Sequence, residues 1–365
     1  MESLIIYGGA FDPIHNGHLR IARAASMMLN ADVVFVPTKT PRWKTPEATA
    51  KQRVDMLRIA LKADGSPAFS LDLFEMKSKS EHSYSIDTVR HMALVHRNAK
   101  LYLLIGADEV NSFPKWKDPD KICELATPLY VARPGIDLDD EVLTRFKMQR
   151  LPYEGSGPVS STKVRNLVDL DIPTPVRDYI ESNGLYYMAK LKGMMSDKRY
   201  LHSLSVATLA YSIAAKNRVE DYRKAYIAGL LHDCGKEIDE ATSKQVMQER
   251  YPEFAGLPQW TYHQFVGAFV AETVFGIKDE DILDAIRYHA TGRAHMPPIS
   301  KIIYASDKIE PLRGYDSTKL IAACYRSYYV GFMNTLAENR DFLFSKGYTV
   351  DNPLTKAAFE LYIGD

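Results

Sequence analysis

The sequence predicts two domains, an α/β domain with a parallel sheet over residues 1–190 and an all-α domain over residues 197–365. Three observations support this fold class. In the first half, short apolar runs alternate with helical patterns, which is typical of a parallel sheet with crossover helices. In the second half, amphipathic helical patterns follow one another and strand-like runs nearly vanish. A chain of 365 residues is also long enough for two domains of ordinary size.

The expected elements of the first domain follow from these patterns. Its strands are predicted at Leu4–Tyr7, Val33–Pro37, Leu101–Ile105 and Leu129–Val131. The helices predicted between them include His18–Leu29, Lys51–Lys62 and Ser85–His96.

The second domain begins after Tyr187–Asp197, a segment that fits neither pattern and reads as a junction. Its helices are predicted, among others, at Lys198–Lys216, Asp221–Leu231, Gln264–Phe275, Glu280–His289 and Ser300–Ile309.

Composition narrows the class of protein. Lys plus Arg and Asp plus Glu both number 46, so no basic excess points to nucleic acid or to a membrane surface. No apolar stretch approaches the ~20 residues of a membrane span. The N-terminus runs directly into a strand-like segment, unlike a signal peptide. The three cysteines lack CxxC spacing, and we expect a reduced, cytoplasmic protein. The sequence predicts no oligomeric state.

Two segments carry the chemistry of the first domain. In LIIYGGAFDPIHNGHL, Gly8 and Gly9 follow a strand, and His15 and His18 lie at a helix start. Such glycines let the backbone approach a ligand closely, and helix amides and imidazole N–H groups favour an anion. The glycines alone are equally compatible with a simple loop. Histidines at this spacing without a third ligand make a poor zinc site.

The second segment, VSSTKVR at residues 159–165, places hydroxyl and basic side chains at another predicted helix start. Each segment offers hydrogen-bond donors and positive charge. Together they predict an enzyme that holds a triphosphate from two sides.

GGAFDPIHNGHL resembles the GxFDPxHxGHL signature of the nucleotidyltransferase superfamily, and the rest of residues 1–190 is similar to bacterial nicotinate-mononucleotide adenylyltransferases. The resemblance implies a Rossmann-like fold and adenylyl transfer from ATP to nicotinate mononucleotide, with release of pyrophosphate. Superfamily members that use pantetheine-phosphate or glycerol-phosphate acceptors are the alternatives. The further matching segments are YSIDTV (84–89), LIGADEVNSFPKWKDPDKI (104–122), VARPG (131–135), VSSTKVR (159–165) and VRDYIESNGLY (176–186).

The resemblance also implies roles for single residues. His15, His18 and Arg165 act on the ATP phosphates, and His18 stabilises the transition state. Trp116 stacks on the pyridine ring, and Asp108 binds ribose hydroxyls unless it is merely a helix cap. Mg²⁺ accompanies ATP by bridging its phosphates. The expected nucleotide-binding residues are Gly8, Gly9, Phe11, Lys44, Thr88, Gly106, Asp108, Trp116, Arg133, Ser161 and Thr162.

One segment departs from the family. Where the family usually has Pro-His-Lys after its second strand, this chain has Pro41-Arg42-Trp43-Lys44. Lys44 therefore remains a candidate phosphate contact in a locally different pocket.

Histidines lie on apolar helix stripes in the second domain. His202 shares a face with Val206 and Leu209, and His289 shares one with Ile282 and Ile286. One inward histidine is usually a satisfied core residue. Three inward histidines with two aspartates on four successive helices instead predict a metal site, because buried charges need a partner. The three histidines and two aspartates are His202, His232, His289, Asp233 and Asp307. Such a donor set suits Fe, Mn or Zn.

The order His202, His232-Asp233, Asp307 resembles the HD phosphohydrolase superfamily. Longer segments around these residues are similar to those of bacterial HD hydrolases that split diadenosine tetraphosphate symmetrically into two ADP. The matching segments are KRYLHSLSVA (198–207), AGLLHDCGKE (228–237), YHQFVGA (262–268), AIRYHATGR (285–293) and YASDKIEPLR (304–313).

This resemblance implies that His202, His232, Asp233 and Asp307 hold a metal, with iron favoured over manganese and zinc, and that Asp233 is catalytic. His263 and His289 face a second metal position or the phosphates. Arg199, Lys236 and Arg313 contact the nucleotide. Two alternatives remain for this domain: hydrolysis of another nucleotide, or a non-catalytic nucleotide-sensing module.

Overall fold

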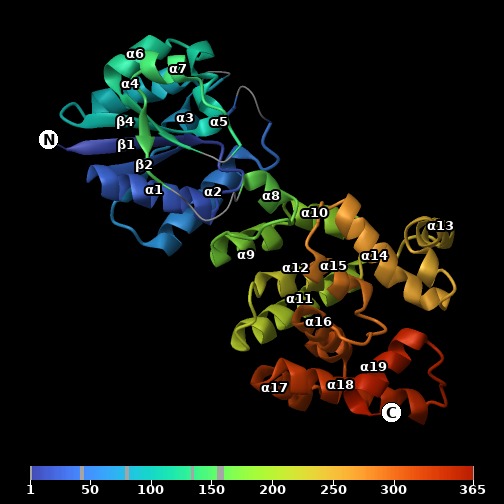
Figure 1. The fold of residues 1–365 in the computed structure, drawn as a ribbon. Helices are drawn as coiled ribbons and strands as arrows, with labels where there is room; N and C mark the ends of the chain where they lie inside the picture. The colour runs from blue at the N-terminus through green and yellow to red at the C-terminus, as the bar shows by residue number, and fades with distance from the viewer. Residues whose placement is uncertain (1, 42–44, 79–81, 133–134, 154–159, 365) are drawn as a thin grey trace. The chain divides into compact units, whose positions relative to one another are not determined.

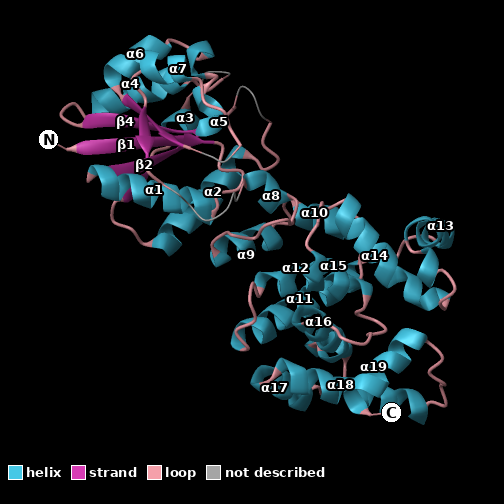
Figure 2. Cartoon of the chain, in the orientation of Figure 1, coloured by secondary structure: helices cyan, strands magenta, loops and turns pink. Residues whose placement is uncertain are grey.

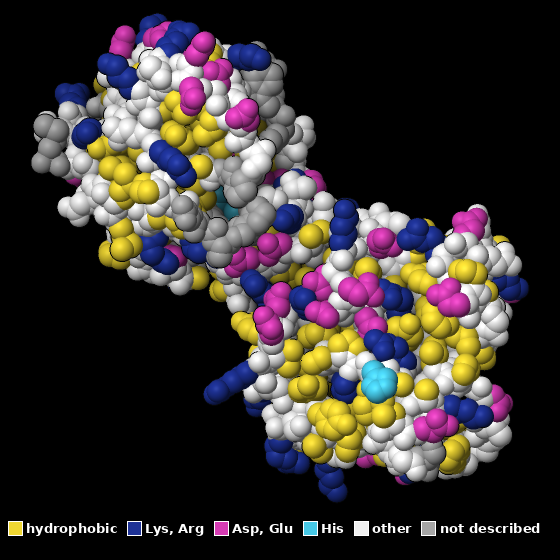
Figure 3. All heavy atoms as spheres, in the orientation of Figure 1, with side chains coloured by type: hydrophobic (Ala, Val, Ile, Leu, Met, Phe, Trp, Pro, Cys, Tyr) yellow, Lys and Arg dark blue, Asp and Glu magenta, His cyan; other side chains and the backbone are white. Residues whose placement is uncertain are grey.

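The computed structural model describes residues 2–41, 45–78, 82–132, 135–153 and 160–364. The chain divides into two compact units, Met1–Tyr186 and Tyr187–Asp365 (Figure 1). On the face drawn in Figure 3, acidic and basic side chains are interspersed over both units. No helix of the described residues is both long and apolar enough to cross a membrane.

The first unit is built on a parallel sheet, as expected (Figure 2). The strand order is β3-β2-β1-β4-β5-β6, and each neighbouring pair is parallel. The strands are β1 Ser3–Gly9, β2 Asp32–Pro37, β3 Phe69–Leu71, β4 Lys100–Gly106, β5 Thr127–Val131 and β6 Gln149–Leu151.

Helices cover both faces of this sheet. Helices α4, α6 and α7 share a core on one face with Ile6, Val34 and Leu103, whereas α1 packs against β1 and β2. Because both faces are buried, the central strands are nearly continuous apolar runs, and this is why the sequence reveals them. The helices are α1 Asn16–Leu29, α2 Ala50–Asp64, α3 Phe74–Lys77, α4 Ser85–Val95, α5 Ala107–Val110, α6 Pro119–Leu125, α7 Asp140–Arg145, α8 Ser161–Arg165 and α9 Thr174–Ser182, with the 3₁₀ turn η1 Phe113–Lys115.

The edge strands β3 and β6 were not predicted. Each has three residues, and β3 pairs with β2 through Phe69–Val33 while β6 pairs with β5. Runs this short have no periodicity of their own. They become strands because a neighbouring strand supplies the hydrogen bonds.

The second unit is helical throughout its described residues, as expected. The segment Tyr187–Asp197, expected as a junction, contains helix α10 and the start of α11. The helices are α10 Tyr187–Lys192, α11 Asp197–Lys216, α12 Arg223–Leu231, α13 Glu240–Arg250, α14 Tyr262–Thr273, α15 Glu280–Arg287, α16 Pro298–Ile309, α17 Thr318–Arg326, α18 Tyr328–Ser345 and α19 Pro353–Ile363, with the 3₁₀ turns η2 Pro252–Phe254, η3 Gln259–Thr261 and η4 Pro311–Arg313.

Two close backbone approaches bring the helices of this unit together. A Cβ atom added at Gly229 of α12 would lie 2.6 Å from the Cα of Ala207 in α11. A Cβ at Gly235 would lie 2.5 Å from the carbonyl oxygen of His263 in α14. Glycine is needed at both positions because backbone atoms occupy the space that a side chain would take.

Candidate functional site

In the first unit, a crevice opens where the strand order reverses between β1 and β4. In parallel α/β sheets this is the place where ligands bind. Two adjoining cavities of about 560 and 280 Å³ share a lining that includes Gly8, Gly9 and Gly106, at the carboxyl ends of these strands. The two cavities therefore adjoin at these glycines.

The larger cavity contains the two histidines of the first motif. His15 is the N-cap of α1: its Nδ1 accepts from the His18 amide at 3.3 Å, and its own amide donates to His18 Nδ1 at 3.2 Å. The rings stack with centroids 3.6 Å apart. Because each Nδ1 accepts a hydrogen bond, each neutral ring carries its proton on Nε2 and donates there.

The second motif reaches the same cavity from 150 residues further along the chain. The Ser161 hydroxyl donates to the Pro13 carbonyl at 2.9 Å. The Arg165 guanidinium donates to the Asp12 carbonyl at 2.6 Å and to Glu47 Oε1 at 2.7 Å. Both segments predicted to hold the triphosphate thus line one cavity, together with Phe11, Asp108 and Thr162.

Asp12 organises this region, although the sequence did not mark it as functional. Its buried carboxylate accepts from the amides of Glu47 and Ala48 and, at 2.8 Å, from the Tyr186 hydroxyl. Burial and this carboxylate raise the pKa of Tyr186. Asp12 lies inside the FDP motif, and its role depends on partners far along the chain.

The smaller cavity holds Thr88 and Trp116, both predicted. Trp116 packs against Phe113 with ring centroids 5.0 Å apart. The Thr88 hydroxyl donates at 2.5 Å to Glu75, a buried carboxyl group that the sequence reasoning missed. Burial raises the pKa of Glu75.

The remaining predicted residues of this unit are placed as follows. Gly106 is the N-cap of α5, and Asp108 lies in the first turn of that helix. A Cβ at Gly106 would lie 2.4 Å from Asp108 Oδ1, so the glycine gives that carboxylate its space. Lys44 and Arg133 lie outside the described residues.

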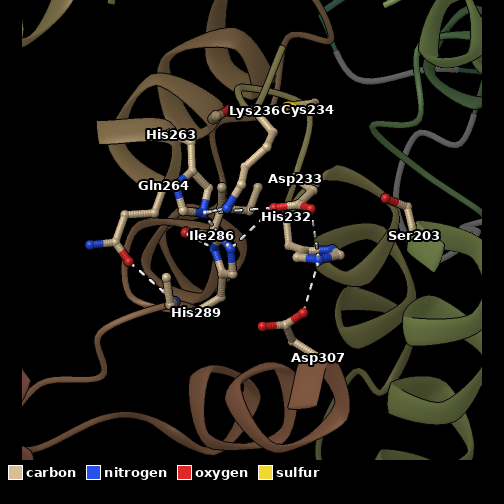
Figure 4. Close-up of polar contacts among 12 residues, drawn as sticks. Ser203, His232, Asp233, Cys234, Lys236, His263, Gln264, Ile286, His289 and Asp307 are labelled. Atoms are coloured by element: carbon tan, nitrogen blue, oxygen red, sulfur yellow. Dashed lines mark hydrogen bonds and ion pairs between the residues drawn. The ribbon is translucent and has the colours of Figure 1, made fainter. Parts of the chain in front are cut away.

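In the second unit, histidines and aspartates from different helices converge (Figure 4). His202, His232 and Asp233 form one group that could hold a metal ion, and Asp233, His263 and His289 form another. Asp307 Oδ1 lies 3.1 Å from His202 Nε2 and 3.5 Å from His232 Nε2. Asp233 belongs to both groups, an arrangement suited to one or two cations.

The tautomers of these rings are set by what Nδ1 contacts. In His232, His263 and His289, Nδ1 donates to the backbone carbonyl three residues earlier, at 2.7–2.8 Å. This leaves a lone pair on Nε2, the atom that points to the centre of the cluster.

The chemistry of the donors fits a divalent metal. The Nε2 atoms of His202 and His232 are 3.2 Å apart, as are those of His263 and His289. Facing lone pairs at this distance repel unless a cation or a proton lies between them.

The carboxylates and the buried histidine have shifted pKa values. Burial would raise the pKa of Asp233, but the neighbouring His232 and His289 outweigh it and hold that pKa well below its usual range. Burial, His289 and Lys236 lower the pKa of His263 to about 3. Burial would lower the pKa of His232, but Asp233 and Asp307 outweigh it and raise that pKa. Ionised carboxylates beside a neutral His263 are in the protonation states that bind a metal, and a metal at the cluster would displace the proton that the carboxylates favour on His232.

The basic residues predicted for this unit border the cluster. Arg199 donates to Asp233 Oδ2 at 2.5 Å, and Arg313 donates to Asp307 Oδ1 at 2.5 Å. Lys236 Nζ lies 3.2 Å from His263 Nε2. Each of these three basic side chains therefore contacts one of the candidate metal ligands.

The fold and the two sites define the class: a nucleotidyltransferase-like domain followed by an HD domain. A family model described as cytidylyltransferase-like matches residues 6–167, and the HD domain model matches residues 199–312.

Known proteins resemble the chain over most of its length. A Mycoplasma genitalium protein named probable nicotinate-nucleotide adenylyltransferase/Ap4A hydrolase is 33% identical over 321 residues, covering 86% of this chain and 88% of the relative. A Mycoplasma pneumoniae protein of the same name is 30% identical over 91% of this chain and 97% of its own. The nicotinate-nucleotide adenylyltransferase of Bacillus subtilis is 35% identical over 51% of this chain and 99% of its own. The chain therefore belongs to the two-domain nicotinate-nucleotide adenylyltransferase/Ap4A hydrolase family.

Proposed function

We propose that the chain is a bifunctional enzyme. Its first unit transfers the adenylyl group of ATP to nicotinate mononucleotide, which yields nicotinate adenine dinucleotide and pyrophosphate. Its second unit hydrolyses diadenosine tetraphosphate symmetrically to ADP. The observation that carries the first activity is the pair of adjoining cavities that share Gly8, Gly9 and Gly106. One cavity contains phosphate-binding groups and the other an aromatic ring suited to a pyridine.

In the transfer reaction the mononucleotide phosphate attacks the α-phosphorus of ATP and pyrophosphate leaves. No protein nucleophile is required, so the rate acceleration comes from positioning the two nucleotides and from stabilising charge on the phosphates. His15 and His18 donate from Nε2 to phosphate oxygens, and the Arg165 fork binds them from α8. Trp116 stacks on the pyridine ring. Mg²⁺ bound with ATP would add to this charge neutralisation.

In the hydrolase unit, His202, His232, Asp233 and Asp307 would hold one transition metal, and His263 and His289 with Asp233 a second. Iron is favoured, while manganese and zinc suit the same donors. A metal bound there would lower the pKa of water and so activate it near neutral pH. Asp233 would be a ligand in both groups, and Arg199, Lys236 and Arg313 would neutralise charge that develops on the phosphates.

The two activities are tested by a nucleotide panel on the full chain. We expect His18→Ala to lower the kcat of adenylyl transfer by about 10²–10³-fold and to leave hydrolysis intact, because one charge-stabilising donor is lost. We expect Asp233→Ala to abolish hydrolysis and to leave transfer intact. His96→Ala and Asp341→Ala, which lie outside both sites, are the controls.

Two outcomes would contradict the proposal. Undiminished transfer in His18→Ala would remove the role of that histidine, and loss of both activities in either variant would refute two separate sites. A panel in which only another nucleotide is hydrolysed would reassign the substrate of the second unit. Binding without turnover would make that unit a nucleotide-sensing module.

A further inference from the structure

One histidine of the metal cluster is held differently from the other three. His232, His263 and His289 each donate from Nδ1 to a backbone carbonyl. His202 Nδ1 instead lies 3.0 Å from Oε1 of Glu310, a carboxylate that is only 1% exposed. Sequence reasoning assigned no role to Glu310.

The position of each histidine in its helix explains the difference. His232 caps the end of α12, His263 is the second residue of α14, and His289 follows the end of α15. The carbonyls that accept from them lie in the last turn of α12, in the 3₁₀ turn η3 and in the last turn of α15. At the C-terminal end of a helix, carbonyl groups are left without an intrahelical partner and can accept from a side chain. His202 is the sixth residue of the long helix α11, where the carbonyls already accept from helix amides. Its Nδ1 therefore needs an acceptor from another element.

Glu310 supplies that acceptor in a fixed orientation. It follows the last residue of α16, and its Oε2 accepts from the Leu312 amide at 2.7 Å, which caps the turn η4. Asp307, three residues earlier in α16, contacts the opposite nitrogen of His202 at 3.1 Å. The last turn of α16 thus holds both nitrogens of the same imidazole.

We infer that Glu310 is a positioning residue that keeps the proton of His202 on Nδ1 and aims Nε2 at the metal. The inference rests on the proposed metal site and adds a residue that acts on the metal only through His202. A carboxylate behind a ligating histidine fixes its tautomer and ring orientation and increases the electron density at the ligating nitrogen. Glu310 itself has both oxygens engaged, one by His202 and one by Leu312.

The experiment compares Glu310→Ala and Glu310→Gln with the wild type, all as full chains treated with a chelator. Binding of Mn²⁺ is measured by calorimetry, and the His202 tautomer by ¹H–¹⁵N correlation spectra of the imidazole rings. We expect Glu310→Ala to weaken Mn²⁺ binding by about 10–100-fold and to shift the His202 ring signals. Glu310→Gln keeps an acceptor without the charge, so its affinity should lie between those of the alanine variant and the wild type.

Asp239→Ala is the matched control. Asp239 caps α13 in the same unit through the Thr242 amide and belongs to neither group of candidate metal ligands. Like Glu310→Ala, the Asp239→Ala variant loses a side chain that caps a helical segment. We expect it to keep wild-type Mn²⁺ affinity and unchanged His202 signals. A folded Glu310→Ala with wild-type affinity would overturn the inference. If the alanine variant does not fold, wild-type affinity in Glu310→Gln would overturn it equally, as would a wild-type chain that binds no Mn²⁺.

The Mn²⁺ affinities, taken together with the hydrolysis measured in the nucleotide panel, separate this inference from the proposed reaction. Mn²⁺ binding that depends on Glu310, without hydrolysis of diadenosine tetraphosphate, supports the positioning role and refutes the substrate. Hydrolysis with Mn²⁺ affinity unchanged by Glu310→Ala supports the reaction and refutes the positioning role.

Discussion

Glu75 shows how burial changes the chemistry of a single side chain. It lines the smaller cavity of the first unit, its Oε1 accepts from Thr88, and its Oε2 has no hydrogen-bond partner among the described atoms. Burial disfavours the charged carboxylate and so raises its pKa above the ordinary 4.5.

This shift predicts a pH-dependent stability. A raised folded-state pKa means that the folded protein keeps the Glu75 proton at a pH where the unfolded chain has lost it. The contribution of Glu75 to stability is thus present below pH 4.5 and is lost as the pH rises through the folded pKa. Glu75→Gln cannot ionise, so we expect its free energy of unfolding to improve relative to the wild type between pH 5 and pH 8. Urea unfolding at both pH values measures this, with Glu124→Gln, an exposed site, as the control. An equal difference at the two pH values would contradict it.

Single residues differ in how far the sequence reveals them. His15 and His18 could be named because they lie three positions apart in one motif, and helix geometry brings such neighbours together. Asp12, Glu75 and Glu310 could not, because their partners Tyr186, Thr88 and His202 lie 174, 13 and 108 residues away.

Among elements, α11 and α12 pack backbone against backbone beside the histidine–aspartate cluster. Gly229 lies against the backbone of Ala207, and its carbonyl oxygen also accepts from His232 Nδ1 at 2.7 Å. Gly229 therefore allows the close packing of the two helices and also orients the ring of His232, a candidate metal ligand.

We expect Gly229→Ala to destabilise the chain by about 1–3 kcal/mol, because the methyl group has no room beside backbone atoms. It should also weaken Mn²⁺ binding, since α12 carries His232. Chemical unfolding and calorimetry are the measurements. Gly256→Ala is the control, because a Cβ at Gly256 meets no atom within 4 Å. Stability and affinity like those of the control would show that α12 can move away from α11 without cost.

The elements themselves could be predicted where burial covers both sides of a strand or one side of a helix. β1 and β4 and the helices α11 and α16 meet that condition, and the expected segments overlap them. β3 and β6 do not, because three residues at a sheet edge are too few for a pattern.

At the scale of the whole molecule, the two units carry separate chemistry. The two adjoining cavities are lined by residues of the first unit, and the histidine–aspartate cluster is formed by residues of the second. Removal of a metal from the cluster should therefore affect the activity and stability of the second unit alone.

Removing transition metals with a chelator tests this separation. We expect hydrolysis to be lost and adenylyl transfer to persist once Mg²⁺ is returned. Because a metal that binds only the folded state stabilises it, amide exchange should become faster in residues 187–365. Exchange in residues 1–186 should not change, and mass spectrometry of peptides measures both. Faster exchange in the first unit as well, or in neither, would contradict the prediction.

The sequence by itself determined the two fold classes and the order of the domains, and it predicted most of the candidate site residues. Periodicity and short motifs are local properties, and local geometry follows from them. Only the tertiary structure decided which groups meet: Ser161 with Pro13, 148 residues apart, and His202 with Glu310, 108 residues apart. Such contacts depend on how helices and strands pack, and no local pattern records the packing partner. Glu310 accepts from His202, an imidazole inside a helix, because α16 ends beside α11, and that arrangement is a property of the tertiary structure alone.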